Sequence, residues 1–319
     1  MYHITVNELI QFFKKQEISC QIPKSYPEDK SFTFASIFEP ISNGLYFYLG
    51  NEMKFPITDS LLLVNQDNQI KSAGHGNIPI YIDANPQIVY YKILLHFHEE
   101  KSNGHISPLS VIHEDAKIGK NVQIDAFCVI GKATIGDNCI IKSHCTINDN
   151  SEIQNNVHID SGSVIGARGV AWIWNESETE KIIQPQIGGV EIGAYSFLGA
   201  HSVVVRGSIN EKTRIGHHTL LAPGSRIGHG TQIGNYVHFA NNVITGGNTK
   251  IADYCFVGSS AVFRPKVKLK PETIVGAGAV VTKDNTEVGS TLVGVPAKQL
   301  KTKSHPSGMP KPKSKSSRK

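Results

Sequence analysis

Large apolar side chains, mostly aliphatic, recur every six residues through the middle of the chain, with one step of five from Ile130 to Ile135 and a few interruptions. A helix would place apolar residues three or four positions apart, and a strand with one buried face would alternate by two. A period of six fits neither and is typical of a parallel β-helix built from hexapeptide repeats, in which three short strands form each coil. The repeat is carried by Ile112, Ile118, Ile124, Ile130, Ile135, Ile141, Ile147, Ile153, Ile159, Ile165, Ile192, Leu198, Val204, Ile215, Leu221, Ile227, Ile233, Phe239, Ile251, Val257, Phe263, Leu269, Val275 and Val281.

Glycine often follows the repeated aliphatic residue, as in Ile118-Gly119 and Ile215-Gly216. We expect the aliphatic residue to point into the core and the glycine to lie at a tight corner, where its freedom in φ and ψ is needed. The pattern therefore predicts a mainly β fold.

The repeat divides the chain into parts. Residues 1–103 lack it, and they contain two helix starts: a capping box at Thr5 to Glu8, and Asn85 followed by Pro86. Between these starts lie short apolar runs typical of strands, so we expect a small α/β domain. The β-helix should span 106–297, with an excursion loop at 167–186 that carries Trp172 and Trp174. The remainder, 298–319, is a basic segment that we expect to be disordered.

Composition excludes several classes of protein. Hydrophobic residues make up 39% of the 319 residues, and no run approaches the ~20 apolar residues of a membrane span. The start of the chain lacks the pattern of a signal peptide. The five cysteines lack metal-type spacing, so we expect reduced packing residues in a cytoplasmic protein, with neither a metal nor a bound cofactor.

The charge of the chain is concentrated at its end. The formal net charge is +5, but residues 301–319 hold seven Lys or Arg and no acid, which leaves −2 for the rest. The basic character is thus a tail and not a nucleic-acid-binding face. Such a tail could attract an acidic partner by long-range steering.

Four segments together resemble one enzyme family. They are Pro185 to Gly193, Arg206-Gly207-Ser208 with Thr213 to Gly216, Ile227 to Gly234, and Gly246 to Ile251. These stretches resemble the UDP-3-O-acylglucosamine N-acyltransferases of lipid A biosynthesis, and Gly44 to Phe55 matches more loosely. The resemblance implies a left-handed parallel β-helix, a homotrimer with active sites between subunits, and acyl transfer from acyl carrier protein or CoA to a UDP-linked amino sugar.

The resemblance also implies roles for single residues. His229 falls where the family carries its catalytic histidine. Tyr48 and Phe55 fall on a pair of aromatic residues that stacks on uracil, and Asn51 falls on a polar contact to the base.

Several positions depart from the family pattern. An Asp-Asn pair is Ala222-Pro223 here, an Asp before Arg-Gly is Val205, and a second histidine is Lys266. In place of the family's C-terminal helices stands Val293 to Lys298, which is similar to the ending of acetyl-CoA-dependent hexapeptide transferases. Two alternatives therefore remain open: an acetyl-CoA-dependent sugar acetyltransferase of surface polysaccharide synthesis, and a non-catalytic β-helix that serves assembly.

Acyl transfer from a thioester requires a base for the attacking group. It also requires a hydrogen-bond donor that stabilises the oxyanion formed on the thioester carbonyl. Histidine suits the base because its reference pKa of ~6.5 lies near working pH. His229 stands two positions after a core isoleucine, at a predicted corner where packing does not demand a histidine; His217, His218 and His238 are its rivals. The N–H groups of Gly246 and Gly247, one coil further on, are the predicted oxyanion donors.

Overall fold

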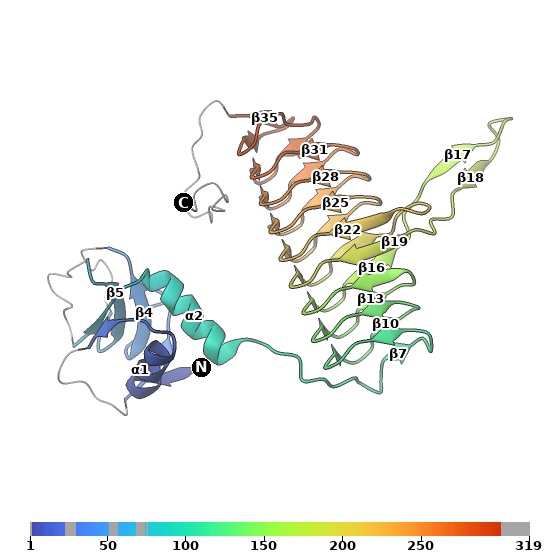
Figure 1. Cartoon of the computed structure of the whole chain (residues 1–319). Coiled ribbons are helices and arrows are strands. Elements are labelled where there is room, and N and C mark those ends of the chain that lie inside the picture. The colour runs from blue at the N-terminus through green and yellow to red at the C-terminus, as the bar shows by residue number, and fades with distance from the viewer. Residues whose placement is uncertain (1, 23–29, 51–56, 68–73, 75, 301–319) are drawn as a thin grey trace. The chain divides into compact units, whose positions relative to one another are not determined.

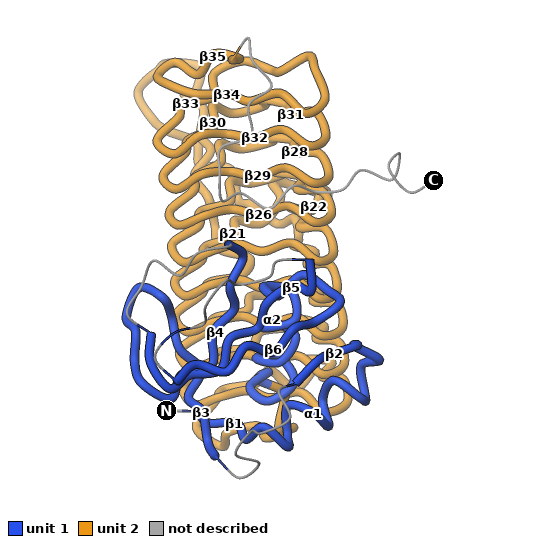
Figure 2. Tube along the Cα trace, turned by 90° about the vertical axis from the view of Figure 1, so that its left-hand side faces the viewer, with its two compact units in different colours: residues 1–100 blue, residues 101–319 orange. Residues whose placement is uncertain are grey.

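The computed structural model describes residues 2–22, 30–50, 57–67, 74 and 76–300. The chain divides into two compact units, residues 1–100 and residues 101–319 (Figure 2). Of the predicted disordered segment, 298–319, the part 301–319 lies outside the described residues. The prediction is wrong for its start, because Lys298–Gln299 form a strand that pairs with Thr291–Val293. Each unit has its own core and is described separately.

The first unit is a six-stranded sheet with both helices on one face. Strands run in the order β1-β3-β4-β5-β6-β2, and β3 to β6 are parallel to one another. The elements are β1 (His3–Thr5), α1 (Val6–Lys15), β2 (Cys20–Gln21), β3 (Ser31–Phe34), β4 (Gly44–Tyr48), β5 (Leu61–Asn65), β6 (Ile78–Ile82) and α2 (Pro86–His98).

Alternation along the strands gives the sheet two apolar faces. Leu45, Leu61 and Leu63 pack with both helices, whereas Tyr46 and Leu62 belong to a second cluster on the opposite face. The two predicted helix starts are confirmed. Thr5 and Glu8 form a reciprocal capping box, and the Asn85 side chain accepts from the backbone at the start of α2.

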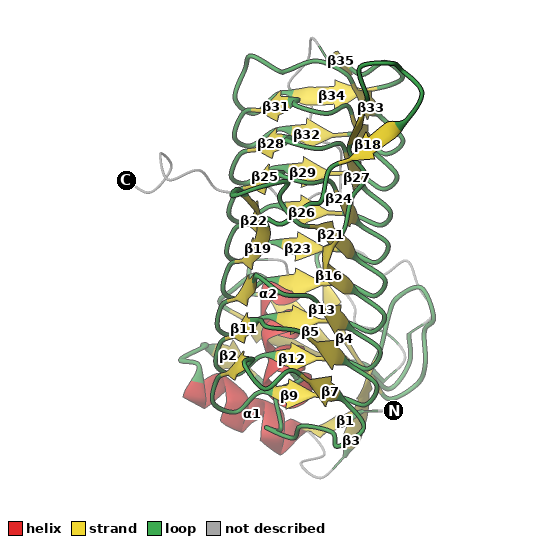
Figure 3. Ribbon diagram, turned by 90° about the vertical axis from the view of Figure 1, so that its right-hand side faces the viewer, coloured by secondary structure: helices red, strands yellow, loops and turns green. Residues whose placement is uncertain are grey.

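The second unit is a three-sided parallel β-helix, as the six-residue period predicts (Figures 1 and 3). Consecutive strands lie on successive faces, so every third strand joins the same sheet. The nine-stranded sheet contains β7 (Val111–Ile112), β10 (Val129–Ile130), β13 (Thr146–Ile147), β16 (Val164–Ala167), β21 (Val203–Val205), β24 (Arg226–Ile227), β27 (Ile244–Thr245), β30 (Val262–Phe263) and β33 (Val280–Val281).

The eight-stranded sheet contains β8 (Lys117–Ile118), β11 (Thr134–Ile135), β14 (Ser151–Ile153), β19 (Gly189–Ile192), β22 (Lys212–Ile215), β25 (Gln232–Ile233), β28 (Lys250–Ile251) and β31 (Lys268–Leu269). The ten-stranded sheet contains β9 (Gln123–Ile124), β12 (Ile140–Ile141), β15 (His158–Ile159), β20 (Phe197–Leu198), β23 (Leu220–Leu221), β26 (His238–Phe239), β29 (Phe256–Val257), β32 (Ile274–Val275), β34 (Thr291–Val293) and β35 (Lys298–Gln299).

The repeated aliphatic residues form a continuous column inside the β-helix. Ile130, Ile147 and Ile165 are register partners in successive turns and are at most 1% exposed. Aliphatic burial of this kind contributes ~25 cal/mol per Å² removed from water. Each turn therefore stabilises its neighbours, as in other solenoids.

The corners correct the expectation about glycine. At the corner that contains Gly119 and Gly216, the left-handed φ lies two positions after the glycine, on Asn121 (51°) and His218 (53°). The glycines are needed because the next turn passes very close: a Cβ on Gly216 would lie within about 2.5 Å of the Gly234 backbone. Close approach, and not conformational freedom, selects glycine there.

The excursion at 167–186 contains an antiparallel hairpin, not an irregular loop. Strand β17 (Trp172–Trp174) pairs with β18 (Lys181–Ile183), and the hairpin projects from the β-helix (Figure 1). The Lys181 ammonium lies 4.3 Å from the ring centroid of Trp172. Strand β14 pairs directly with β19 across the base of the excursion, so the ladder continues without interruption.

The helices of the described residues are α1 and α2, with ten and thirteen residues. Neither is long and apolar enough to span a bilayer.

Candidate active site

His229 lies at the corner between β24 and β25, as predicted. Ile227 and Ile233 anchor the two sides of this corner in the core, with at most 4% of their surface exposed. Gly230 completes the turn with a φ of 66°. The imidazole is half-buried, so it is accessible to a reactant while its neighbours restrict its motion.

Two neighbours fix the ring of His229. The hydroxyl of Ser208 lies 3.1 Å from Nδ1. The other end of the ring fills the space above Gly247, where a Cβ would lie 2.3 Å from Nε2. Gly247 occupies the same position of the next turn, and Asn248 N–H donates to the His229 carbonyl at 2.7 Å. The glycine therefore provides the space that the imidazole occupies.

Threonine hydroxyls hold the backbone of this corner from inside. Thr245 stands at a core position that is aliphatic in most turns, and its Oγ1 accepts from Gly228 N–H at 3.0 Å. Thr213 Oγ1 accepts from Gly230 N–H at 2.8 Å. Both threonines are at most 4% exposed. Both amides that flank His229 are thus bonded to buried side chains, which rigidifies the segment that carries the imidazole.

Ser208 is held by a carboxylate in its own loop. Glu211 accepts from Ser208 N–H at 2.7 Å and from Ile209 N–H at 3.0 Å. The Ile209 N–H, together with the Ser208 N–H and hydroxyl, lowers the pKa of Glu211 below its usual value. The carboxylate is therefore ionised at neutral pH and sits beside the hydroxyl that contacts His229. Sequence reasoning missed Glu211, although it follows the Arg-Gly-Ser segment at short range.

The two glycines predicted as oxyanion donors differ in the structure. Gly246 N–H already donates to the Phe263 carbonyl at 2.8 Å in the ladder between turns. Within the part of the chain that the structure describes, Gly247 N–H has no partner. Because a free N–H is needed to stabilise an oxyanion, Gly247 is the better candidate.

The rival histidines His217 and His218 lie at a different corner. The ring of His218 stacks between Tyr195 and Tyr236, with centroids 4.9 Å from each and nearly parallel planes. His217 meets Tyr236 edge-on at 5.3 Å. Packing against these tyrosines accounts for both histidines without a catalytic role.

His238 faces outward from β26, in the middle of the ten-stranded sheet. Its ring lies 5.1 Å from the ring of Phe256, and burial lowers its pKa. No hydroxyl or carboxylate partner of this imidazole is found among the described residues. His229 is therefore the histidine whose surroundings best suit general base chemistry.

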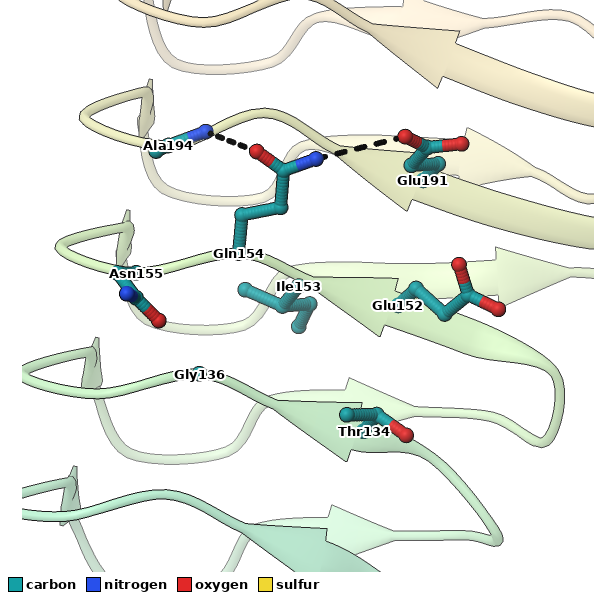
Figure 4. Close-up of a pocket in the computed structure, with 8 residues that line it drawn as sticks. All are labelled: Thr134, Gly136, Glu152, Ile153, Gln154, Asn155, Glu191 and Ala194. Atoms are coloured by element: carbon teal, nitrogen blue, oxygen red, sulfur yellow. Dashed lines mark hydrogen bonds between the residues drawn. The ribbon is translucent and has the colours of Figure 1, made fainter.

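A separate pocket of about 490 Å³ opens on the eight-stranded sheet, over β11, β14 and β19 (Figure 4). Gln154 crosses it, accepting from Ala194 N–H at 3.2 Å and donating to Glu191 at 3.4 Å. The two carboxylates that line the pocket form ion pairs, Glu152 with Lys212 and Glu191 with Arg214. The pocket does not include His229, and ion pairing already explains its acids, so we assign the chemistry to the His229 corner.

The predicted nucleotide site is described in part. Tyr48 ends β4, and its half-buried ring packs in the apolar cluster on the sheet face away from the helices. Asn51 and Phe55 lie outside the described residues. The register places Tyr48 beside Val64 and Val64 beside Tyr81, so two tyrosines flank one valine on this face. The sequence does not predict Tyr81 as part of this site, because Tyr81 is two strands away from Tyr48 in the sheet.

Metal chemistry finds no support in the described residues, which hold no group of three His, Cys, Asp or Glu side chains arranged for an ion. Cys128, Cys139, Cys145 and Cys255 are buried free thiols. They pack in the core of the β-helix, as expected for reduced packing residues.

Comparisons with known proteins agree with the hexapeptide-repeat fold. The family model for bacterial transferase hexapeptide repeats matches residues 115–149, 132–168 and 212–247. The acyl-[acyl-carrier-protein]–UDP-N-acetylglucosamine O-acyltransferase of Rickettsia bellii is 32% identical over 131 residues, 40% of this chain and 43% of that protein. Over its hexapeptide repeats the chain is similar to a UDP-sugar acyltransferase.

Two further relatives extend the comparison. The UDP-3-O-acylglucosamine N-acyltransferase of Hydrogenovibrio crunogenus is 32% identical over 109 residues, 34% of this chain and 26% of that protein. The crystal structure of Francisella novicida UDP-N-acetylglucosamine acyltransferase superposes with a TM-score of 0.54 at 27% identity, over 61% of this chain and 68% of that one. This hexapeptide-repeat chain spans less than half the length of these two curated relatives.

Proposed function

We propose that this protein is an acyltransferase that moves an acyl group from a thioester to the amino group of a UDP-linked amino sugar, as in lipid A biosynthesis. The observation that carries the proposal is the His229 corner: an accessible imidazole, held at Nδ1 by Ser208, beside the free N–H of Gly247. The relatives support the reaction class, because their names join acyl transfer to UDP-sugars.

The residues suit each step of the transfer. Nε2 of His229 takes the proton from the sugar amine as its nitrogen attacks the thioester carbonyl. The carbonyl oxygen becomes an oxyanion, which the Gly247 N–H stabilises. Collapse of the tetrahedral intermediate breaks the C–S bond, and the thiolate leaves with the proton that His229 carried. The products are an amide and a free thiol.

Acyl carrier protein is the proposed donor, because the Rickettsia relative bears it in its name. The basic residues of 301–319 would attract an acidic carrier at long range. CoA is the alternative donor. The cytoplasmic location expected from the sequence stays a prediction.

Uridine recognition is proposed for the first unit. Tyr48 offers a half-buried aromatic ring on the sheet face away from the helices, and Tyr81 lies on the same rung. Aromatic faces of this kind stack on bases. Asn51 and Phe55 remain part of the proposal on the grounds of the resemblance.

A homotrimer is proposed from the outward faces of the β-helix. On the nine-stranded sheet the outward residues are mostly aliphatic, among them Val111, Val129 and Ile244, which are 68%, 48% and 38% exposed. The eight-stranded sheet instead presents charged residues such as Glu191, Arg214 and Lys250. Large exposed apolar faces mark association sites, and a second and third copy would cover them.

O-acylation is the second candidate reaction. It is supported by the Rickettsia relative, which is named an O-acyltransferase. The base and oxyanion donor would serve a hydroxyl nucleophile equally well. The reaction is N- or O-acylation according to whether the acyl acceptor presents an amino group or a hydroxyl.

A donor and acceptor screen tests the proposal. The full chain and His229→Ala are incubated with carrier-protein and CoA thioesters of graded length, and with UDP-3-O-acylglucosamine or UDP-N-acetylglucosamine. Mass spectrometry identifies the product as amide or ester. His229→Ala should reduce turnover by roughly 10²–10⁴, and the control His217→Ala should not. A folded protein that transfers no acyl group in any combination would favour the assembly module instead.

A further inference from the structure

We propose that the cationic stretch 264–270, together with Lys250, binds the phosphate at the far end of the donor's pantetheine arm. The inference rests on the proposed acyl transfer and adds the subsite that holds its donor. Acyl carrier protein and CoA share this chemistry, because each carries its acyl thioester on a pantetheine arm that ends in a phosphate.

The stretch from Arg264 to Lys270 contains four cations and no acid. Val267 and Leu269 point into the core and are at most 4% exposed, so the residues between them face outward. Arg264, Lys266, Lys268 and Lys270 are all exposed. In the described part of the chain, no ion pair involves any of these four cations.

This stretch forms the turn that follows Gly247. The Lys266 N–H donates to the Gly247 carbonyl at 2.9 Å, and a Cβ on Gly246 would lie 2.5 Å from the Pro265 nitrogen. Strands β25, β28 and β31 are successive rungs of one sheet, from the His229 corner toward the end of the β-helix (Figure 1). The cations therefore begin one turn beyond the candidate oxyanion donor, where an arm leaving the thioester toward the later turns reaches them.

Lys250 adds a fifth cation from the preceding turn. Lys250 and Lys268 are register partners on β28 and β31, and neighbouring strands are roughly 4.7–4.9 Å apart. Like charges in such a pair repel each other. Asp284 accepts from the Lys268 backbone N–H at 2.8 Å, but among residues 76–300 it forms no ion pair with either lysine. A phosphate bound between the two side chains offsets their repulsion.

The other cations around this corner are engaged or isolated. Lys212 and Arg214 form ion pairs on the eight-stranded sheet. Arg206 donates through Nε to the Gly166 carbonyl at 2.8 Å. Arg226 stands alone between aliphatic register partners of the nine-stranded sheet. Several unpaired cations together, which suit the several oxygens of a phosphate, are found instead at Lys250 and 264–270.

The backbone of Lys266 suits other residues better than lysine. Its φ is 68°, and Gly230 and Asn248 hold the equivalent corner position in the two preceding turns, with φ values of 66° and 56°. Glycine and asparagine tolerate a left-handed φ, whereas a lysine there is strained. Lys266→Asn therefore removes the cation and introduces a residue that fits the backbone, so it tests the charge without endangering the fold.

Donors with and without the phosphate test the site. The full chain, Lys266→Asn and Lys268→Gln are assayed with the same acyl group on pantetheine, phosphopantetheine, CoA and carrier protein. Each variant should raise KM for the phosphate-bearing donors by roughly 3- to 10-fold, the effect of losing one charge-assisted contact at an exposed site, with kcat unchanged. KM for the pantetheine thioester, which has no phosphate, should stay the same.

Two further variants serve as controls for this assay. Lys266→Arg keeps the cation and should retain the wild-type KM. Lys117→Gln removes an exposed lysine from β8, at the opposite end of the same sheet, and should change no KM. The donor with the lower wild-type KM, carrier protein or CoA, identifies the source of the phosphate.

Three results would overturn the site. They are an equal rise in KM for the pantetheine thioester, an unchanged KM in both Lys266→Asn and Lys268→Gln with every donor, and a rise confined to the carrier-protein donor. The last result would show that the stretch contacts the surface of the carrier and not a phosphate.

Binding without turnover separates this site from the proposed function. Calorimetry of the full chain with phosphopantetheine and with pantetheine needs neither an acyl group nor an acceptor. Phosphopantetheine should bind more tightly than pantetheine to the wild type and to His229→Ala, and this difference should shrink in Lys266→Asn. Acyl transfer with a KM that no cation variant changes would reject the site and leave the acyltransferase standing. Phosphate-dependent binding in a chain that transfers no acyl group would do the reverse.

Discussion

The Nε2 atom of His229 takes the place that a side chain on residue 247 would fill, since a Cβ on Gly247 would lie 2.3 Å from it. The histidine in one turn and the glycine in the next are therefore one structural unit. The pair explains why a half-exposed imidazole has a defined position on the surface of a solenoid.

Gly247→Ala should displace the imidazole and leave the fold intact. The added methyl group meets only the end of a side chain, so the ring can swing outward at little cost in stability. We expect turnover to fall by at least about tenfold, since displacing the base forfeits part of the roughly 10²–10⁴ that a positioned base contributes, and the melting temperature to change little. The control is Gly278→Ala, which has open space at its Cβ but a φ of 68°. It should destabilise the fold slightly without affecting turnover.

Thr245→Val should lower both stability and activity. It keeps the shape of the side chain but leaves the Gly228 N–H without its acceptor, a loss that typically costs about 1–3 kcal/mol. Thr219→Val is the matched control, since Thr219 accepts from Val237 N–H at another corner. Chemical unfolding and turnover are measured together. Equal losses of activity in the two variants would show that Thr245 has no special relation to His229.

Tyr48→Ala should weaken the binding of UDP to the full chain. Base stacking on an aromatic ring is worth about 1–3 kcal/mol, or roughly 5- to 150-fold in Kd. Tyr81→Ala should weaken binding as well if the two tyrosines share one site, and Tyr91→Ala, an exposed residue of α2, serves as the control. Calorimetry with UDP and UMP provides the measurement. Unchanged affinity in Tyr48→Ala would exclude this face as the nucleotide site.

His238 should make the protein less stable in mild acid. Burial lowers its pKa in the folded state, so the unfolded chain binds its proton more readily. Stability from this group is present above the unfolded pKa of ~6.5 and is lost as the pH falls from there toward the folded pKa. Urea midpoints at pH 7.5 and 5.5 should differ less in His238→Gln than in the wild type. A difference of the same size in both proteins would assign the effect to other groups.

Ile244→Glu should dissociate the proposed trimer. It puts a charge on the apolar outward face of the nine-stranded sheet, where association would bury it without a partner. Lys250→Glu, on the charged face, is the control and should leave the assembly unchanged. Sedimentation velocity reports the mass of each protein. A wild-type monomer at micromolar concentration would contradict the proposal directly.

The sequence was sufficient for the fold because the repeat acts locally. A period of six specifies which side chains enter the core of each turn, and successive turns need only stack in register. The prediction that corner glycines are needed for their conformational freedom is wrong at Gly216. The close approach of the next turn selects glycine there, and a local pattern does not show that approach. The hairpin within 167–186 was missed because its strands do not follow the repeat.

The sequence places the candidate base His229 at a corner of the β-helix, but it does not indicate the neighbours of that residue. The corner location of His229 follows from counting two residues beyond Ile227. The contact with Ser208 joins residues 21 positions apart, and Glu211 enters only through Ser208. Tyr81 is linked to Tyr48 through the strand between them. Such relations depend on which turn or strand lies alongside, and composition does not reveal them.

The uninterrupted pairing of β14 with β19 has a consequence for how such a chain can change. The whole excursion leaves and re-enters at one corner, and Ser151 still meets Val190 as though nothing lay between them. A corner can therefore accept a foreign segment of any length whose two ends lie close together, while an insertion inside a strand would shift every later turn. Corners are the natural grafting points of this scaffold, where evolution or a protein engineer can add new recognition elements.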